Sequence, residues 1–227
     1  MHVREMPFLV TLVAPLNLIL TSKLDNRKTD HIWRKISSQL ANLKKKGFRV
    51  TEATVNPESE LTRLDNLFGD VGIELKHVAV KQHVVAAERR IRMIKERCRG
   101  IISTLSCRLC KKLLESLIYH VTQRINMEPS SVNGYGPTPW ESHSGRKVNY
   151  SVTIKASFGE YCLAGTNSGD NSMEPSARGA ITRYEASDID SNWRVFHLES
   201  KRLVKRYELT LWPMPDIVIN CLNDLHD

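Results

Sequence analysis

The sequence predicts a mixed α/β unit followed by a small all-β unit. In the first 126 residues, two apolar runs precede alternating helical and strand patterns, and two long helical patterns close this part. After Asn126 the composition changes: residues 127–150 are rich in Pro, Ser and Gly, and short strand-like runs follow at regular spacing. The 41% hydrophobic fraction is sufficient for a real core.

The first part is expected to start with a hairpin that turns at Pro15 to Asn17. The next predicted helix has inward apolar residues one turn apart, and Gly47 suits its C-terminal cap. The predicted strands are 7–14, 16–22, 48–55 and 73–80, and the predicted helices are 29–46, 58–68, 84–103 and 108–126. This order is typical of a ribonuclease H-like α/β layer.

The second part is expected to be a surface linker, then a small barrel, then a short helix or a frayed tail. Its strand-like runs are YSVTI, GEYCLA, ARGAITRY, WRVFHLE and LVKRYELTLW. The predicted domain limits are 1–126, 127–150, 151–215 and 216–227.

Two features of the sequence bear on the cellular compartment in which the protein resides. The apolar run 7–20 is too short to span a bilayer, and no clear cleavage site follows it, so paired strands are preferred over a secretory signal. Five cysteines at irregular spacing favour a reducing compartment, nuclear or cytoplasmic. Cys107 and Cys110 form a lone CxxC without a second pair, which we interpret as chance spacing on a helix rather than a zinc site.

The predicted helix 84–103 carries the most chemistry. Its apolar stripe places Glu88 at the stripe's edge, and a second row holds Arg89, Arg92, Glu96 and Arg99. A carboxylate surrounded by cations suits a metal ligand beside a phosphate backbone, although an amphipathic helix with an outer basic face is more often only solvated.

Positive charge is concentrated in this region. Residues 84–126 hold ten Lys and Arg against three Asp and Glu, whereas the whole chain has a formal charge of +8. Such a segment is typical of a polyanion binder, with an inert basic surface as the alternative. A second basic group lies near Trp193, Tyr207 and Trp212, and either binds nucleic acid or is an ordinary strand surface. The candidate nucleic-acid-binding residues are Arg89, Arg90, Arg92, Lys95, Arg97, Arg99, Lys201, Arg202, Lys205 and Arg206.

The run QHVVAAERRIRMIKER resembles the last catalytic helix of Copia-type retrotransposon integrases. TQRINMEPSS, GPTPWESHSGRKVNY, SFGEYCLA, NSMEPSARGAI and LTLWPMPD resemble segments that follow this helix in such Gag-Pol polyproteins, so the resemblance covers nearly the whole chain. It implies a ribonuclease H-like integrase core and then an SH3-like domain. It also implies that Glu88 is the third acid of an Asp-Asp-Glu triad, with Mg or Mn as cofactor. The implied partner is DNA, either retroelement ends or target duplex; homo-oligomers remain open and no membrane is involved.

The chain departs from the family pattern at the other two acids. Val55 stands where relatives carry the Asp of a Thr-Asp-Gly-Glu pattern, and an isopropyl group binds no metal. Residues 1–12 resemble the continuation of a strand whose Asp precedes it in relatives, so we expect a truncated first strand that begins after the first acid. Glu58 and Glu60 are the candidates for replacing the second acid.

These observations predict an integrase-like fragment that binds nucleic acid, is related to DNA integration, has no strand-transfer activity and holds no metal. Two alternatives stay open. One is an active Mg-dependent integrase that gene annotation has truncated. The other is a domesticated, non-catalytic binding or assembly protein.

Overall fold

The computed structural model describes residues 1–55, 63–78, 85–129, 136–165, 176–185 and 192–225, without the side chain of Glu185. Their contacts divide the chain into two compact units. The first comprises Met1–Lys95 and Thr122–Lys147, and the second comprises Glu96–Val121 and Val148–Asp227. Two boundaries between these units fall inside long helices, at Lys95/Glu96 and Val121/Thr122, whereas the predicted domain limits do not. The predicted limits therefore stay a prediction.

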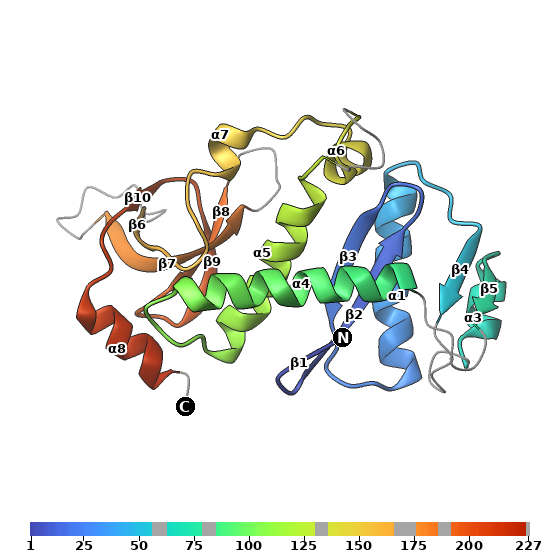
Figure 1. Cartoon of the computed structure of the whole chain (residues 1–227), viewed down its shortest axis with the longest axis horizontal. Coiled ribbons are helices and arrows are strands. Elements are labelled where there is room, and N and C mark those ends of the chain that lie inside the picture. The colour runs from blue at the N-terminus through green and yellow to red at the C-terminus, as the bar shows by residue number, and fades with distance from the viewer. Residues whose placement is uncertain (56–62, 79–84, 130–135, 166–175, 186–191, 226–227) are drawn as a thin grey trace. The chain divides into compact units, whose positions relative to one another are not determined.

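A β-hairpin starts the first unit, as predicted. Strands β2 (Met6–Val13) and β3 (Leu18–Lys23) pair antiparallel, and Asn17 adopts a positive φ in the turn between them. The short β1 (His2–Val3) pairs back onto β2 (Figure 1). The first residues therefore fold back on β2 rather than continue it, contrary to the continuous strand expected over residues 1–12.

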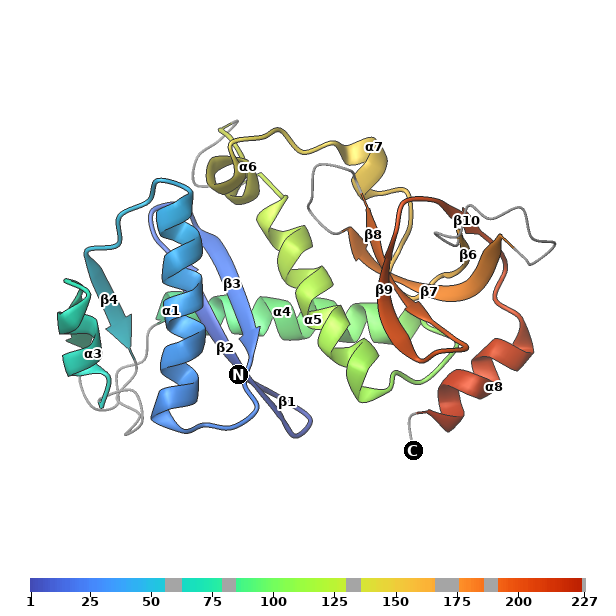
Figure 2. The ribbon, with the colours of Figure 1, turned by 180° about the vertical axis from the view of Figure 1, so that it is seen from behind.

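Helix α1 (Thr29–Lys45) packs on one face of this hairpin. Its Gln39 accepts a hydrogen bond from the Thr11 hydroxyl of β2 and donates one to Ser22 of β3. The helix ends as predicted, because Gly47 has φ +84° and the N–H of Phe48 reaches back to the carbonyl of Leu43. Figure 2 shows α1 alongside the hairpin.

The other strands of this unit form a separate two-stranded parallel sheet, β4 (Glu52–Val55) with β5 (Glu74–His77). Helix α3 (Asp65–Asp70) lies between them in sequence and buries Phe68 against Ile32 of α1 and Ile73. The strands predicted over 48–55 and 73–80 are present but shorter. Of the helix predicted over 58–68, residues 58–62 lie outside the described residues.

Helices α4 (Val85–Thr104) and α5 (Lys111–Asn126) match their predicted limits closely. Both contribute residues to each unit. At the end of α5, the Asn126 amide accepts a hydrogen bond from the N–H of Ile19 and donates one to its carbonyl, each at 2.8 Å. This buried side chain satisfies two backbone groups of β3, so it fixes the end of the helix against the hairpin.

The predicted linker is partly folded. Helix α6 (Pro139–Ser144) starts with a complete capping box, in which Thr138 and Glu141 exchange side-chain and backbone hydrogen bonds. Thr138 and Pro139 are buried. The Thr-Pro-Trp-Glu sequence carries this signal, so the interpretation of 127–150 as a surface linker was wrong for this helix.

The second unit contains a five-stranded antiparallel sheet in the order β10-β6-β7-β8-β9. The strands predicted over 159–164, 177–184 and 193–199 are present, and the predicted run 203–212 forms two strands. Their bounds are β6 (Tyr161–Gly165), β7 (Ala177–Glu185), β8 (Trp193–His197), β9 (Arg202–Arg206) and β10 (Leu209–Leu211). The assignment of YSVTI to a strand was wrong, because this segment forms the one-turn helix α7 (Tyr150–Thr153).

Helix α5 also contacts this sheet, through Ser116, which accepts a hydrogen bond from Arg183 of β7. The tail folds as helix α8 (Asp216–Asp224), the first of the two predicted options, and buries Val218 and Leu222. The all-β part of the prediction is therefore confirmed as one antiparallel sheet, and its SH3-like identity stays a prediction. Within the described residues, no helix has the length and apolar composition needed to cross a bilayer.

Candidate nucleic-acid interface

Helix α4 presents a basic outer face, as its residue spacing predicts. Ile94 and Cys98 of the apolar stripe are buried, and Ala87, Ile91 and Ile101 are half-buried. The predicted second row, Arg89, Arg92, Glu96 and Arg99, is exposed along its whole length. Val84 lies outside the described residues. The burial of Cys98 raises its pKa to about 11, so this thiol is neutral and unreactive at physiological pH.

Three of the cations lie close together on one side of α4. Arg92 is one helical turn from both Arg89 and Lys95, and all three side chains are exposed. None of them forms an ion pair or hydrogen bond with a described residue. From Arg89 to Lys95 the helix rises about 9 Å, a distance over which duplex DNA presents about five phosphate charges. The other predicted residues of α4 differ in exposure, since Arg99 is exposed whereas Arg90 and Arg97 are half-buried.

Glu88 lies in the first turn of α4 and is exposed. A carboxylate at this place also stabilises the helix through its dipole, whether or not it ever binds a metal. Among the residues that the structure describes, Glu88 belongs to no group of three His, Cys, Asp or Glu side chains that could hold a metal ion.

Val55 ends β4, the strand that the family resemblance implies would supply the second acid. Its side chain is half-buried, and its carbonyl accepts a hydrogen bond from the N–H of Val78. Because two Mg²⁺ ions need several carboxylate oxygens, Val55 and a single Glu88 do not fit the metal pair that the family resemblance implies. Glu58 and Glu60, the candidate replacements, lie outside the described residues.

The second predicted basic group lies at and beside the edge strand β9. Lys201, Arg202 and Lys205 are exposed, and Arg206 is half-buried. The three aromatic residues predicted beside them differ in solvent exposure. Trp193 is 1% exposed and belongs to the core of the sheet, whereas Tyr207 is 67% and Trp212 is 55% exposed. Only the two exposed rings can stack against a ligand.

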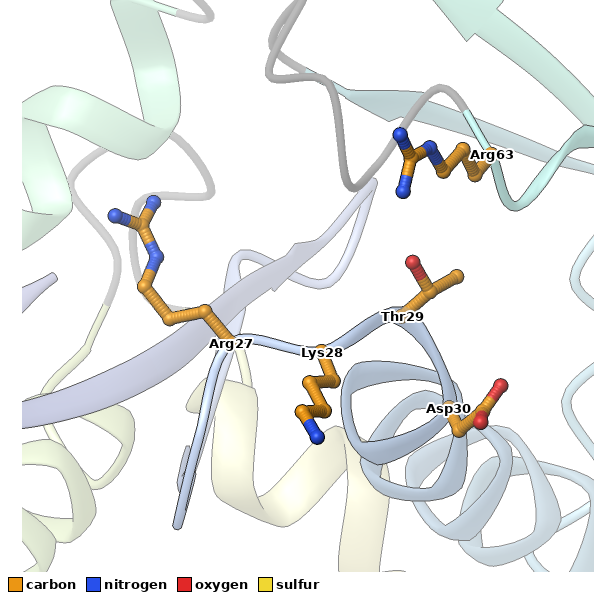
Figure 3. A pocket seen from close by; sticks show the side chains of 5 residues that line it. All are labelled: Arg27, Lys28, Thr29, Asp30 and Arg63. Atoms are coloured by element: carbon orange, nitrogen blue, oxygen red, sulfur yellow. The ribbon is translucent and has the colours of Figure 1, made fainter.

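A basic pocket at the start of α1 was not predicted. It has a volume of about 560 Å³ and is lined by Arg27, Lys28, Thr29, Asp30 and Arg63. Figure 3 shows the guanidinium groups of Arg27 and Arg63 on opposite sides of the opening. No side chain caps this end of α1, so the helix dipole adds to the positive potential, and the Asp30 carboxylate opposes it. The Arg-Lys pair directly before a helix start is the sequence signal for such a pocket.

Cys107 and Cys110 lie in the connection before α5, not on a helix as predicted. Cys110 is buried and Cys107 is half-buried. Burial, with a smaller effect of the neighbouring Cys110, raises the pKa of Cys107. Both are free thiols, and among the described residues no group of metal ligands includes them. That the CxxC spacing of these two residues arose by chance stays a prediction.

Comparison with known proteins finds a likeness in structure but none in sequence. The chain matches no protein family and no curated protein. Its structure is similar to the crystal structure of the catalytic core domain of BIV integrase, with a TM-score of 0.49 and 15% sequence identity. The match covers 64% of this chain and 90% of that chain. A likeness of this degree transfers neither an activity nor any residue role.

Proposed function

We propose that this chain is an integrase-like protein, related to the Copia type of retrotransposon, that binds duplex DNA and does not transfer DNA strands. One observation carries the proposal: Arg89, Arg92 and Lys95 are exposed on one helix and have no ion-pair partner among the described residues. The resemblance of residues 82–97 to the last catalytic helix of such integrases gives the family.

The physical basis for binding is electrostatic. A cation that already pairs with a carboxylate gains little from a phosphate, because one ion pair only replaces another. The three α4 cations have no described partner to give up, so each phosphate contact releases counterions from the DNA. This binding should be independent of base sequence, because phosphates are the same along the duplex.

The proposed lack of strand transfer is supported by the side chains at the expected metal-binding positions. Strand transfer in this family uses two metal ions that stabilise the attacking and the leaving oxygen. Magnesium and manganese are bound through oxygen ligands, and Val55 offers only methyl groups at the second position. At the two positions supplied by β4 and α4, Val55 and Glu88 together offer one carboxylate, which is too few oxygen ligands to hold a metal pair. We therefore expect no metal cofactor for this chain.

The experiment combines binding and chemistry on the same DNA. The intact chain is incubated with labelled duplex ends and Mg²⁺ or Mn²⁺, and retention and joined products are measured together. We expect retained DNA without joined or trimmed products, and the same result for Glu88→Gln. If the unmodified chain joins ends and Glu88→Gln abolishes joining, the inactive assignment is wrong. Glu58 and Glu60 would then be the first acids to substitute.

A further inference from the structure

Strand β7 contains a β-bulge that redirects one arginine. Thr182 of β7 lies opposite Val195 in the register with β8. Tyr184 lies opposite Arg194, so Arg183 is the extra residue between these two pairs. Because a bulge interrupts the regular alternation of side chains, it can bring successive side chains together. Arg183 and Tyr184 do lie together, since the Arg183 guanidinium is 5.1 Å from the centre of the Tyr184 ring.

A second arginine, on β8, reaches the same tyrosine. The Arg194 guanidinium lies 5.8 Å from the centre of the Tyr184 ring. Burial lowers the pKa of Arg183, and the charge of Arg194 lowers it as well, so the two cations repel each other. The Glu115 carboxylate of α5 acts in the opposite direction and offsets part of the positive charge. Because arginine stays protonated in proteins, the cluster holds two positive charges against one negative charge.

Arg183 is a buried charge whose terminal nitrogens remain available. Its side chain is 4% exposed, and its Nε donates a 2.5 Å hydrogen bond to the Ser116 hydroxyl of α5. Among the described residues no carboxylate forms an ion pair with it, unlike Arg178 of the same strand, which pairs with Glu199. Its terminal nitrogens are not sealed from solvent, whereas the indole nitrogen of Trp193 is. A desolvated cation without a counter-ion is costly, so an anion at these nitrogens is favoured.

The chemistry of the cluster selects the class of anion. Arg194 and Tyr184 are half-buried, so a small ligand can reach them from solvent. Guanidinium groups match the oxygen geometry of both carboxylates and phosphates. Two cations suit a phosphate group better, because it carries close to two negative charges and more acceptor oxygens than a carboxylate.

We propose that Arg183 and Arg194 bind a phosphate group, which accepts hydrogen bonds from both guanidiniums. Ser116 holds the first guanidinium in place, and the Tyr184 ring lies beside both. These residues belong to the second unit, whereas Arg89, Arg92 and Lys95 belong to the first. This phosphate site therefore goes beyond the proposed function and does not depend on it.

The test is a calorimetric titration of the intact chain with inorganic phosphate at constant ionic strength, with acetate as the comparison anion. Arg194→Gln should weaken phosphate binding about tenfold or more, the range expected for losing a charge-assisted hydrogen bond. Arg183→Gln should act alike, and circular dichroism checks that this buried variant folds. The matched control is Arg178→Gln on β7, which should change phosphate binding by no more than about twofold, because that exposed arginine is already paired.

The inference is overturned if phosphate binds no more tightly than acetate, or if Arg194→Gln and Arg178→Gln bind phosphate equally well. A short oligothymidine with and without a 5′-phosphate identifies the source of the group. If the phosphorylated strand binds more tightly and Arg194→Gln removes the difference, the ligand is a strand end. If both strands bind alike while inorganic phosphate still depends on Arg194, the ligand is free phosphate. Charge reversal of the three α4 cations should leave the Arg194-dependent binding intact, so this site and the proposed function can fail separately.

Discussion

Helix α4 and strand β4 are the two elements that, under the family resemblance, would each carry one acid of a catalytic site, and only α4 has a carboxylate there. On α4, Glu88 is present with exposed cations around it. On β4, a half-buried valine occupies the corresponding end. Under the proposed function, binding and chemistry therefore depend on separate elements. A valine in place of a carboxylate on β4 would prevent metal-dependent transfer and would leave the basic surface of α4 unchanged.

The two elements also differ in what a charge costs. An exposed arginine on a helix keeps its hydration, so α4 tolerates many cations with little effect on stability. A half-buried strand end does not hydrate a carboxylate fully, so an acid at position 55 needs a metal or a cation to offset its desolvation. Without a bound metal, an apolar residue is the more stable choice there.

The largest expected effect comes from reversing charge on α4. Arg89→Glu, Arg92→Glu and Lys95→Glu together should lower duplex affinity at least about 100-fold near 0.1 M salt, because about three phosphate contacts are lost. Titration with labelled duplexes of two unrelated sequences measures this, and both should weaken alike.

A matched variant changes the same charge elsewhere in the same unit. Arg34, Lys44 and Lys45 are exposed on α1, and their triple reversal should weaken binding far less. Circular dichroism checks that both variants fold. Equal losses in the two variants would mean that only overall charge matters and that α4 is not the site.

A smaller effect is expected on β4. Val55→Asp should lower the free energy of unfolding by about 1–3 kcal/mol, because a carboxylate is placed in a half-buried apolar position. For a chain of this size, each kcal/mol of lost unfolding free energy lowers Tm by roughly 2–4 °C. Melts with and without Mg²⁺ should agree, since the described residues contain no group of three or more metal-ligating side chains that the new carboxylate could join.

Val55→Asn is the control, because the Asn side chain has nearly the same shape as the Asp side chain and carries no charge. A magnesium-dependent rise in Tm for Val55→Asp alone would show that a metal pocket survives at this strand, since a ligand that binds only the folded state stabilises it.

The smallest effect is expected at Glu88. Glu88→Gln removes one negative charge beside Arg89 and Arg92, so the repulsion of DNA phosphates falls. Duplex affinity should rise by no more than about threefold, as expected for one screened charge in water. A large fall in affinity would contradict the account, because it would mean that Glu88 contributes to binding through a bound cation.

Long elements were predictable from the sequence and single-turn elements were not. The helices at 29–46, 84–103 and 108–126 contain several turns, so their apolar residues define a period. YSVTI reads as a strand because Val, Thr and Ile favour strands, but its four helical residues are too few to show a period. Helix α6 was missed although Thr138 and Glu141 carry a capping box.

The candidate site was predictable only in part. The exposure of Arg89, Arg92 and Lys95 follows from helical spacing alone. The separation of Trp193 from Tyr207 and Trp212 does not, because it depends on which face of the sheet packs on the core. The bulge that brings Arg183 to Tyr184 likewise depends on strand register, which residues distant in the sequence determine.

The salt dependence of duplex binding is the strictest test of DNA binding through α4. The logarithm of the association constant is measured against the logarithm of salt concentration for the unmodified chain and for the α4 triple reversal. We expect a steep linear fall for the unmodified chain and a slope shallower by about 2–3 for the variant, because three phosphate contacts release about that many counterions. A salt-insensitive affinity, or two equal slopes, would contradict DNA binding through α4.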